Sequence, residues 1–120
     1  MSWPQQSTAM VTVQGELDAA NGIPFVEFAL RCSARADRLV IDLSGLSFFA
    51  IAGLNALHTL NAHCAGNDIR CAVASGPAVD RLLGICAPDP SLLVCPDAAE
   101  ALATVNNESP RLLKLVAEPS

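Results

Sequence analysis

Residues 39–54 read Leu-Val-Ile-Asp-Leu-Ser-Gly-Leu-Ser-Phe-Phe-Ala-Ile-Ala-Gly-Leu, and this stretch decides the fold. Leu39–Leu43 is almost continuously apolar and β-branched at its centre, which is typical of a strand that is covered on both faces. After a connection over Ser44–Ala52, apolar residues recur at helical spacing as Leu54, Leu57, Leu60 and Cys64. The stretch therefore predicts a central strand followed by a helix over Ala52–Ala65.

The rest of the chain repeats this alternation of strand and helix. The further strands are expected at Ala9–Leu17, Ile69–Ala74 and Leu92–Val94, and the further helices at 21–36, 75–86 and 97–105. Phe25, Phe28, Ala29, Cys32 and Ala36 would form the apolar face of the first helix. Such alternation favours an α/β fold in which right-handed crossovers join parallel strands, with a mixed pairing allowed at the N-terminal edge.

Length and composition limit the function classes. A chain of 120 residues is one domain in size, and a net charge of −5 with only seven scattered Lys and Arg residues disfavours nucleic-acid binding. No apolar run reaches the length of a membrane span, and the N-terminal residues lack the pattern of a secretory signal. We therefore expect a cytoplasmic protein.

The five cysteines are odd in number and irregular in spacing, which favours reduced, mostly buried thiols. An alternative is a redox switch in which oxidation joins Cys86 to Cys95, or Cys64 to Cys71. This alternative is the less favoured one, because reactivity requires exposure and a lowered pKa, and neither can be read from sequence.

Signatures of catalysis are missing from the sequence, which has no phosphate-binding glycine loop, zinc-protease motif or nucleophile elbow. His58 and His63 lie about 140° apart around a helix and cannot share a metal with Cys64, so we expect no metal and no cofactor. Glu16 and Asp18 fit a turn better than acid-base catalysis, because no basic or nucleophilic residue accompanies them. These observations predict a protein that is not an enzyme.

Two segments resemble the STAS domain of bacterial anti-sigma factor antagonists, also called anti-anti-sigma factors. They are Gly15-Glu16-Leu17-Asp18 and the run from Val40 to Phe48 that leads into Gly53-Leu54, and the resemblance covers about residues 10–102. It implies one STAS domain over residues 1–105, with a mixed sheet of four to five strands and about four helices. Residues 106–120 would be a packed extension or a partner-binding tail, since they contain Leu112, Leu113, Leu115 and Val116.

The resemblance fails at the family's regulatory site. In anti-anti-sigma factors this position reads Asp-Ser-Ser-Gly-Leu, and the first serine is phosphorylated by the anti-sigma factor, a kinase-like ATP-binding protein. Here the stretch reads Ala50-Ile51-Ala52-Gly53-Leu54. Ile51 stands at the phosphosite-equivalent position and cannot be phosphorylated, so a partner surface at this place would lack the family's switch.

The function implied is that of a non-enzymatic regulator of transcription that binds an anti-sigma factor. The implied partner-binding residues lie in a loop and at the start of the second helix: Asp18, Asn21, Phe49, Ala50, Ile51, Ala52, Gly53, Leu54 and Asn55. A STAS accessory subunit of a lipid-transport ATPase, or a signalling scaffold, is an alternative within the same fold. A nucleotide-binding protein or enzyme is a third hypothesis, which saturable ATP or GTP binding would reveal.

Overall fold

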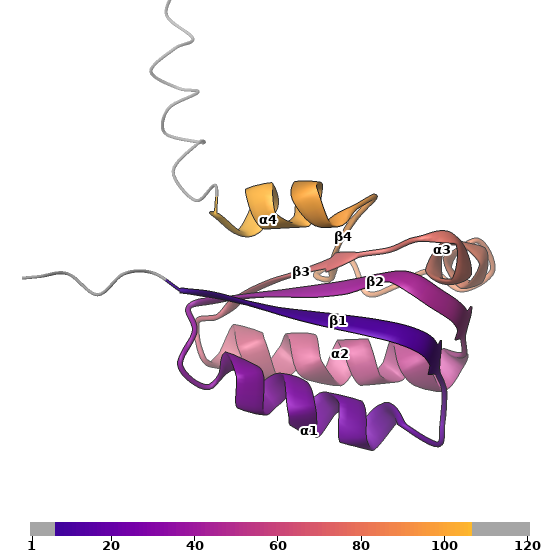
Figure 1. Ribbon diagram of the computed structural model, residues 1–120, viewed down its shortest axis with the longest axis horizontal. Coiled ribbons are helices and arrows are strands. Elements are labelled where there is room, and N and C mark those ends of the chain that lie inside the picture. The colour runs from indigo at the N-terminus through magenta and orange to yellow at the C-terminus, as the bar shows by residue number, and fades with distance from the viewer. Residues whose placement is uncertain (1–6, 107–120) are drawn as a thin grey trace, which may run out of the picture.

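The computed structural model describes residues 7–106 as four strands that alternate with four helices (Figure 1). The strands are β1 (Thr8–Leu17), β2 (Arg38–Phe49), β3 (Arg70–Ala74) and β4 (Leu93–Cys95). The helices are α1 (Gly22–Ser33), α2 (Ile51–Gly66), α3 (Pro77–Leu83) and α4 (Ala98–Asn106). The predicted α/β class and the order of elements are confirmed.

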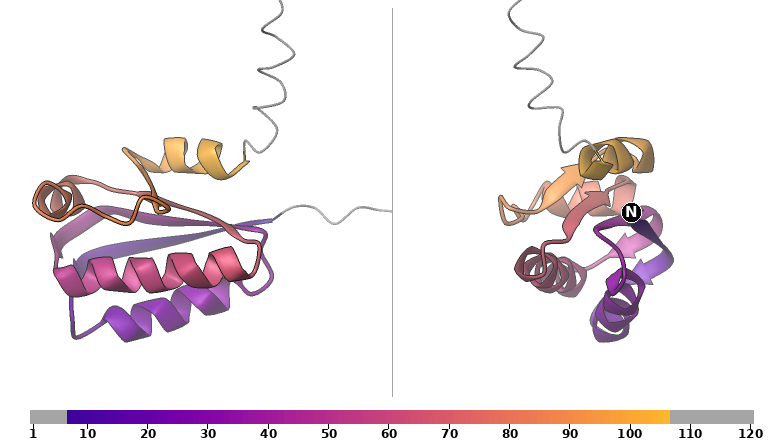
Figure 2. Two further views of the ribbon diagram at one scale, coloured as in Figure 1. Left: turned by 180° about the vertical axis from the view of Figure 1, so that it is seen from behind. Right: turned by 90° about the vertical axis from the view of Figure 1, so that its left-hand side faces the viewer.

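The four strands form one sheet in the order β1-β2-β3-β4, and all three pairs are parallel. α1 and α2 cover one face, α4 lies on the opposite face, and α3 sits at the end where the strands finish (Figures 1 and 2). The expectation of a mixed sheet is not met in residues 7–106. Each of these strands reaches its neighbour through a helical connection, which returns the chain in the same direction.

β2 is the centre of the core because both of its faces are covered. Leu39, Ile41 and Leu43 belong to the cluster beneath α1 and α2, whereas Val40 belongs to the cluster beneath α4. All four side chains are fully buried. This confirms the two-sided burial expected from the apolar run.

β2 continues six residues beyond the predicted strand. Residues 45–49 pair with Gln14–Leu17 of β1 across two register irregularities, at Thr12/Gln14 and Gly15/Glu16. The longer strand brings Phe49 to the end of the sheet, and α2 then begins at Ile51 rather than at Ala52. The connection between strand and helix is therefore one residue long.

The buried face of α1 differs from the predicted one. Gly22, Phe25, Ala29 and Ser33 are buried, but Phe28 and Cys32 are exposed. Residues 28 and 32 each precede a buried residue by one position, so their side chains point away from the buried face. Ser33 is accommodated in the interior because its hydroxyl donates to Leu30 O at 3.2 Å. α1 thus leaves apolar surface uncovered beside β1.

Two arginines fix the C-terminal end of α4 to the sheet. Arg38 of β2, which is 5% exposed, donates from Nε to Val105 O at 2.9 Å, and Arg70 of β3 donates to the same oxygen at 3.1 Å. Thr8 of β1 hydrogen-bonds Asn106 through its hydroxyl at 3.2 Å. The last helix therefore ends next to the start of the first strand, and residues 107–120 of the predicted extension lie outside the described part of the chain.

Candidate functional site

The loop after β1 and the start of α2 meet at the C-terminal end of the sheet. The Ala50 N–H donates to Leu17 O at 3.0 Å, which ties the beginning of α2 to the end of β1. Gly53 permits this approach, because a Cβ there would lie 2.8 Å from Phe49 Cε1 and 3.0 Å from Leu17 O. The two segments predicted to bind a partner are thus brought together.

Asp18 and Asn21 hold the loop in shape. Asn21 accepts from the Asp18 N–H through Oδ1 at 2.8 Å and donates through Nδ2 to Glu16 O at 2.8 Å. Asp18 Oδ1 accepts from the Ala20 N–H at 2.9 Å. Asn21 is the N-cap residue of α1 but makes no side-chain cap bond, so its amide orders the loop rather than the helix end.

The first turn of α2 presents apolar side chains and an uncapped helix end. Ala50 has extended backbone and no side-chain cap hydrogen bond, and the first turn contains no acidic residue. Ile51 is 56% exposed, Ala50 and Ala52 are partly exposed, and Asn55 is exposed one turn later. An uncharged surface therefore surrounds backbone N–H groups at the positive end of the helix dipole.

Phe49, Gly53 and Leu54 are turned inward. Phe49 and Leu54 are each 4% exposed and belong to the core cluster beneath the two helices. These buried residues pack beneath the exposed residues of the first turn of α2 and hold that turn in position. Of the nine residues expected to bind a partner, the solvent-facing ones are concentrated around Ile51 and Asn55.

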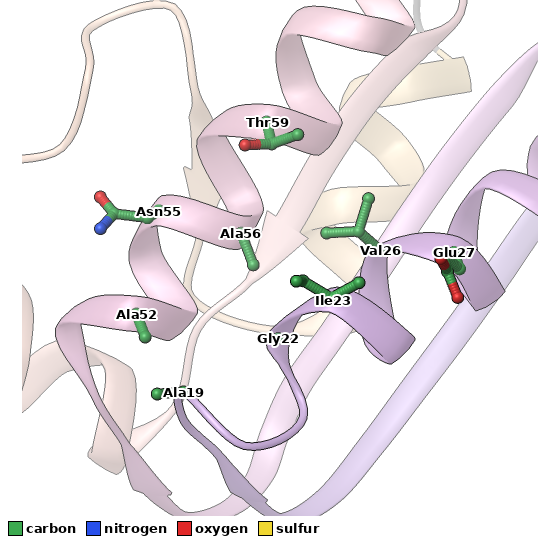
Figure 3. A pocket seen from close by; sticks show the side chains of 9 residues that line it. All are labelled: Ala19, Gly22, Ile23, Val26, Glu27, Ala52, Asn55, Ala56 and Thr59. Carbon is green, nitrogen blue, oxygen red and sulfur yellow. The ribbon is translucent and has the colours of Figure 1, made fainter.

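An apolar groove between α1 and α2 adjoins Ile51 and was not predicted from the sequence. It has a volume of about 440 Å³, and Figure 3 shows Ile23 and Val26 of α1 facing Ala52 and Ala56 of α2 across it. Ile23 is 73% exposed. Ile23 lies outside the predicted apolar face of the first helix. An isoleucine outside that face, next to Pro24, was the feature of the sequence that could have indicated the groove.

A second apolar hollow lies between the end of β2 and α3. It measures about 200 Å³ and is lined by Phe48, Phe49, Ala78, Arg81, Leu82 and Ile85. Phe48 and Ile85 are among the large apolar side chains that remain exposed. Ile23 and Ile51 are exposed as well.

The whole of α2 lacks formal charge. No Asp, Glu, Lys or Arg occurs between Asp42 and Asp68. His58 is engaged locally, since its Nε2 accepts from the Asp89 N–H at 3.1 Å, and the described residues contain no group of three metal-ligating side chains. The start of α2 thus offers apolar side chains and backbone groups for contact.

The predicted redox pair of Cys86 and Cys95 falls in two different core clusters. Cys86 packs against the cluster beneath α1 and α2, and Cys95 belongs to the cluster beneath α4. Cys64 and Cys71 share the first cluster, and the interaction between the two thiols lowers the pKa of Cys64, whereas the same interaction and burial raise the pKa of Cys71. All five cysteines are free, and Cys32 is exposed.

The helices between residues 7 and 106 include none that is both long and apolar enough to cross a bilayer. Residues 4–85 match the family model described as "Mlab, STAS domain". Because the match covers more than half of the sequence, the chain belongs to the STAS domain family. The fold expected from the Gly15–Asp18 and Val40–Phe48 segments is thereby confirmed.

Similar proteins include a curated mycobacterial protein and two solved structures. Osmosensory protein A of Mycobacterium tuberculosis (strain ATCC 25618 / H37Rv) is 39% identical over 75 residues, which cover 62% of this chain and 48% of that protein. The matched region thus spans about half the length of this relative.

The structure of an anti-sigma factor antagonist from Mycobacterium paratuberculosis superposes with a TM-score of 0.73 at 25% identity, covering 87% of this chain and 90% of that one. The STAS domain of a SulP transporter from Vibrio cholerae superposes with a TM-score of 0.62 at 16% identity, covering 92% and 88%. The second likeness concerns the fold alone.

Proposed function

We propose that the chain is a non-enzymatic, cytoplasmic regulator of the anti-anti-sigma type, which binds an anti-sigma factor through the surface around Ile51. The observation that carries the proposal is the first turn of α2, where an exposed isoleucine occupies an uncapped helix end beside an apolar groove. The similarity to a solved anti-sigma factor antagonist supports the same class of partner.

Control of this binding would differ from that of the family. A phosphoryl group adds about two negative charges at a helix N-terminus on a partner surface and blocks docking by repulsion and desolvation. Ile51 has no hydroxyl group to accept it. No phosphoryl charge can therefore be added at this position, and we expect complex formation to follow the concentrations of the two proteins.

The test is a titration of the purified chain with each purified anti-sigma factor of the same genome, with and without prior incubation with ATP. We expect binding that incubation with ATP does not change. An Ile51→Glu variant should bind at least 10-fold more weakly, because it places a charge where an apolar side chain would be buried in the complex. Met10→Glu is the matched control, since Met10 is also partly exposed but lies on β1 facing away from α1 and α2.

The outcomes separate the candidate functions. Binding to no anti-sigma factor, together with binding to a lipid-transport ATPase subunit, would select the accessory-subunit alternative. If Ile51→Glu and Met10→Glu weakened binding equally, the surface around Ile51 would not be the binding site, although an anti-sigma factor would still be the partner. Saturable ATP or GTP binding by the chain alone would contradict the non-enzymatic proposal in favour of a nucleotide-binding protein.

A further inference from the structure

The outer side of β1 is a free sheet edge in residues 7–106. β1 is the first strand in the order β1-β2-β3-β4 and pairs only with β2 among the described strands. A ten-residue edge strand presents a row of backbone donors and acceptors that a further strand can use. β4, at the other edge, is only three residues long.

A groove runs along this edge between β1 and α1, and we name it the β1 edge groove. It has a volume of about 350 Å³, and its lining includes Val13, Glu16, Pro24, Phe25 and Phe28. Phe28 is 49% exposed even though the Arg31 guanidinium lies 5.9 Å from its ring centroid. The groove therefore offers an apolar floor beside unpaired backbone.

Apolar surface is exposed on the other face of the same edge as well. Met10 pairs in register with Val40, whose side chain lies beneath α4, so Met10 points to the α4 face. It is 42% exposed. A strand added outside β1 would have apolar neighbours on both of its faces.

The path of the chain leads to this edge. α4 ends at Asn106, which hydrogen-bonds Thr8 at the start of β1, and fourteen residues follow. If residues 111–117 form a strand, leucines lie on both of its faces, with Leu112 on one face and Leu113 and Leu115 on the other. At about 3.3 Å per residue, seven such residues span most of β1, and residues 107–110, which include Pro110, are available for the turn.

The handedness of the resulting connection is also favourable. α1 and α2 carry the chain from β1 towards β3 across one face, and α4 carries it back towards β1 across the opposite face (Figure 1). A crossover that runs in the opposite direction keeps the same hand only when its helix lies on the opposite face. A strand after α4 that is parallel to β1 thus completes a right-handed crossover.

We propose that residues 111–117 add a fifth, parallel strand to the outer edge of β1 and place leucine side chains in the β1 edge groove. The added strand closes the edge against pairing with other chains. The proposal concerns a surface distant from Ile51, and it stands whether or not an anti-sigma factor is the partner.

Limited trypsin digestion of the full chain, followed by mass spectrometry, tests the proposal because Arg111 and Lys114 lie within the segment. We expect both sites to be cut at least 10-fold more slowly in the chain than in a synthetic peptide of residues 107–120. Phe28→Asp removes the floor of the groove and should abolish this protection. Ile85→Asp is the control, since Ile85 is an exposed isoleucine elsewhere and its change should leave the protection intact.

Two further measurements distinguish loss of docking by the segment from unfolding of the domain. Cleavage at Arg31 or Arg81 reports unfolding of the domain. Leu115→Asn replaces an apolar residue of the segment and alters no residue of 7–106. It should expose Lys114 to cleavage while Arg31 and Arg81 stay resistant. Equal rates in the chain and the peptide would overturn the proposal. Protection that grows with protein concentration would also overturn it, because the segment would then dock on a second copy.

Discussion

Gly53 controls how closely α2 approaches β1, and Gly53→Ala tests this contact directly. The new methyl group would lie 2.8 Å from Phe49 Cε1 and 3.0 Å from Leu17 O. Phe49 is buried and Leu17 O belongs to the backbone, so neither can yield without moving the start of α2. Overpacking of this kind costs about 1–3 kcal/mol, whereas alanine in place of glycine in a helix gains about 1 kcal/mol.

We therefore expect Gly53→Ala to lower the free energy of unfolding by about 1 kcal/mol, equivalent to a fall in melting temperature of about 4 °C. Urea unfolding followed by far-UV circular dichroism measures the change. The matched control is Gly66→Ala at the other end of α2, where a Cβ would meet nothing within 4 Å. This variant should gain about 0.5 kcal/mol. A Gly53→Ala protein as stable as the Gly66→Ala protein would refute the close approach.

Three further predictions follow from described contacts. Arg38→Met removes a buried, charged donor to Val105 O and should lower the free energy of unfolding by about 2 kcal/mol in the same urea assay. An unchanged transition midpoint would contradict the role of Arg38 in fixing α4 to the sheet. Gly76→Ala should cost more than Gly53→Ala, because Gly76 has φ +114° and its Cβ would lie 2.6 Å from Ser44 Cα; calorimetric melting ranks the two variants. In the native protein, one thiol, that of Cys32, should react rapidly with a maleimide, and peptide mapping that finds a different fast cysteine would disprove this assignment.

The central strand and the alternation of elements could be predicted because they depend on local patterns. The apolar run Leu39–Leu43 has the composition that two-sided burial requires, and the structure buries it on both faces. The continuation of β2 to Phe49 could not be predicted in this way. Its pairing with Gln14–Leu17 passes two register irregularities and joins residues about thirty positions apart, so no local signal marks it.

The two segments of the candidate site could be proposed from the sequence, but the shape of the surface they form could not. The sequence located the Asp18–Asn21 loop and the Ile51 helix start, and the structure places them side by side through the Ala50–Leu17 hydrogen bond. The groove beside them depends on how α1 is rotated against α2. That rotation exposes Ile23 and Phe28 while it buries Ser33, and it results from packing against the sheet rather than from the apolar residues of α1 alone.

The absence of formal charge along α2 has a consequence for how fast a complex on this helix would form. Attraction between opposite charges raises association rate constants above the ordinary range of about 10⁵–10⁶ M⁻¹s⁻¹ and makes them sensitive to ionic strength. Ile51–Gly66 offers no such attraction. A complex centred on this helix would therefore owe any salt dependence of its association rate to charges outside α2, such as Glu27 beside the α1–α2 groove, and changes within α2 would act mainly on the dissociation rate constant.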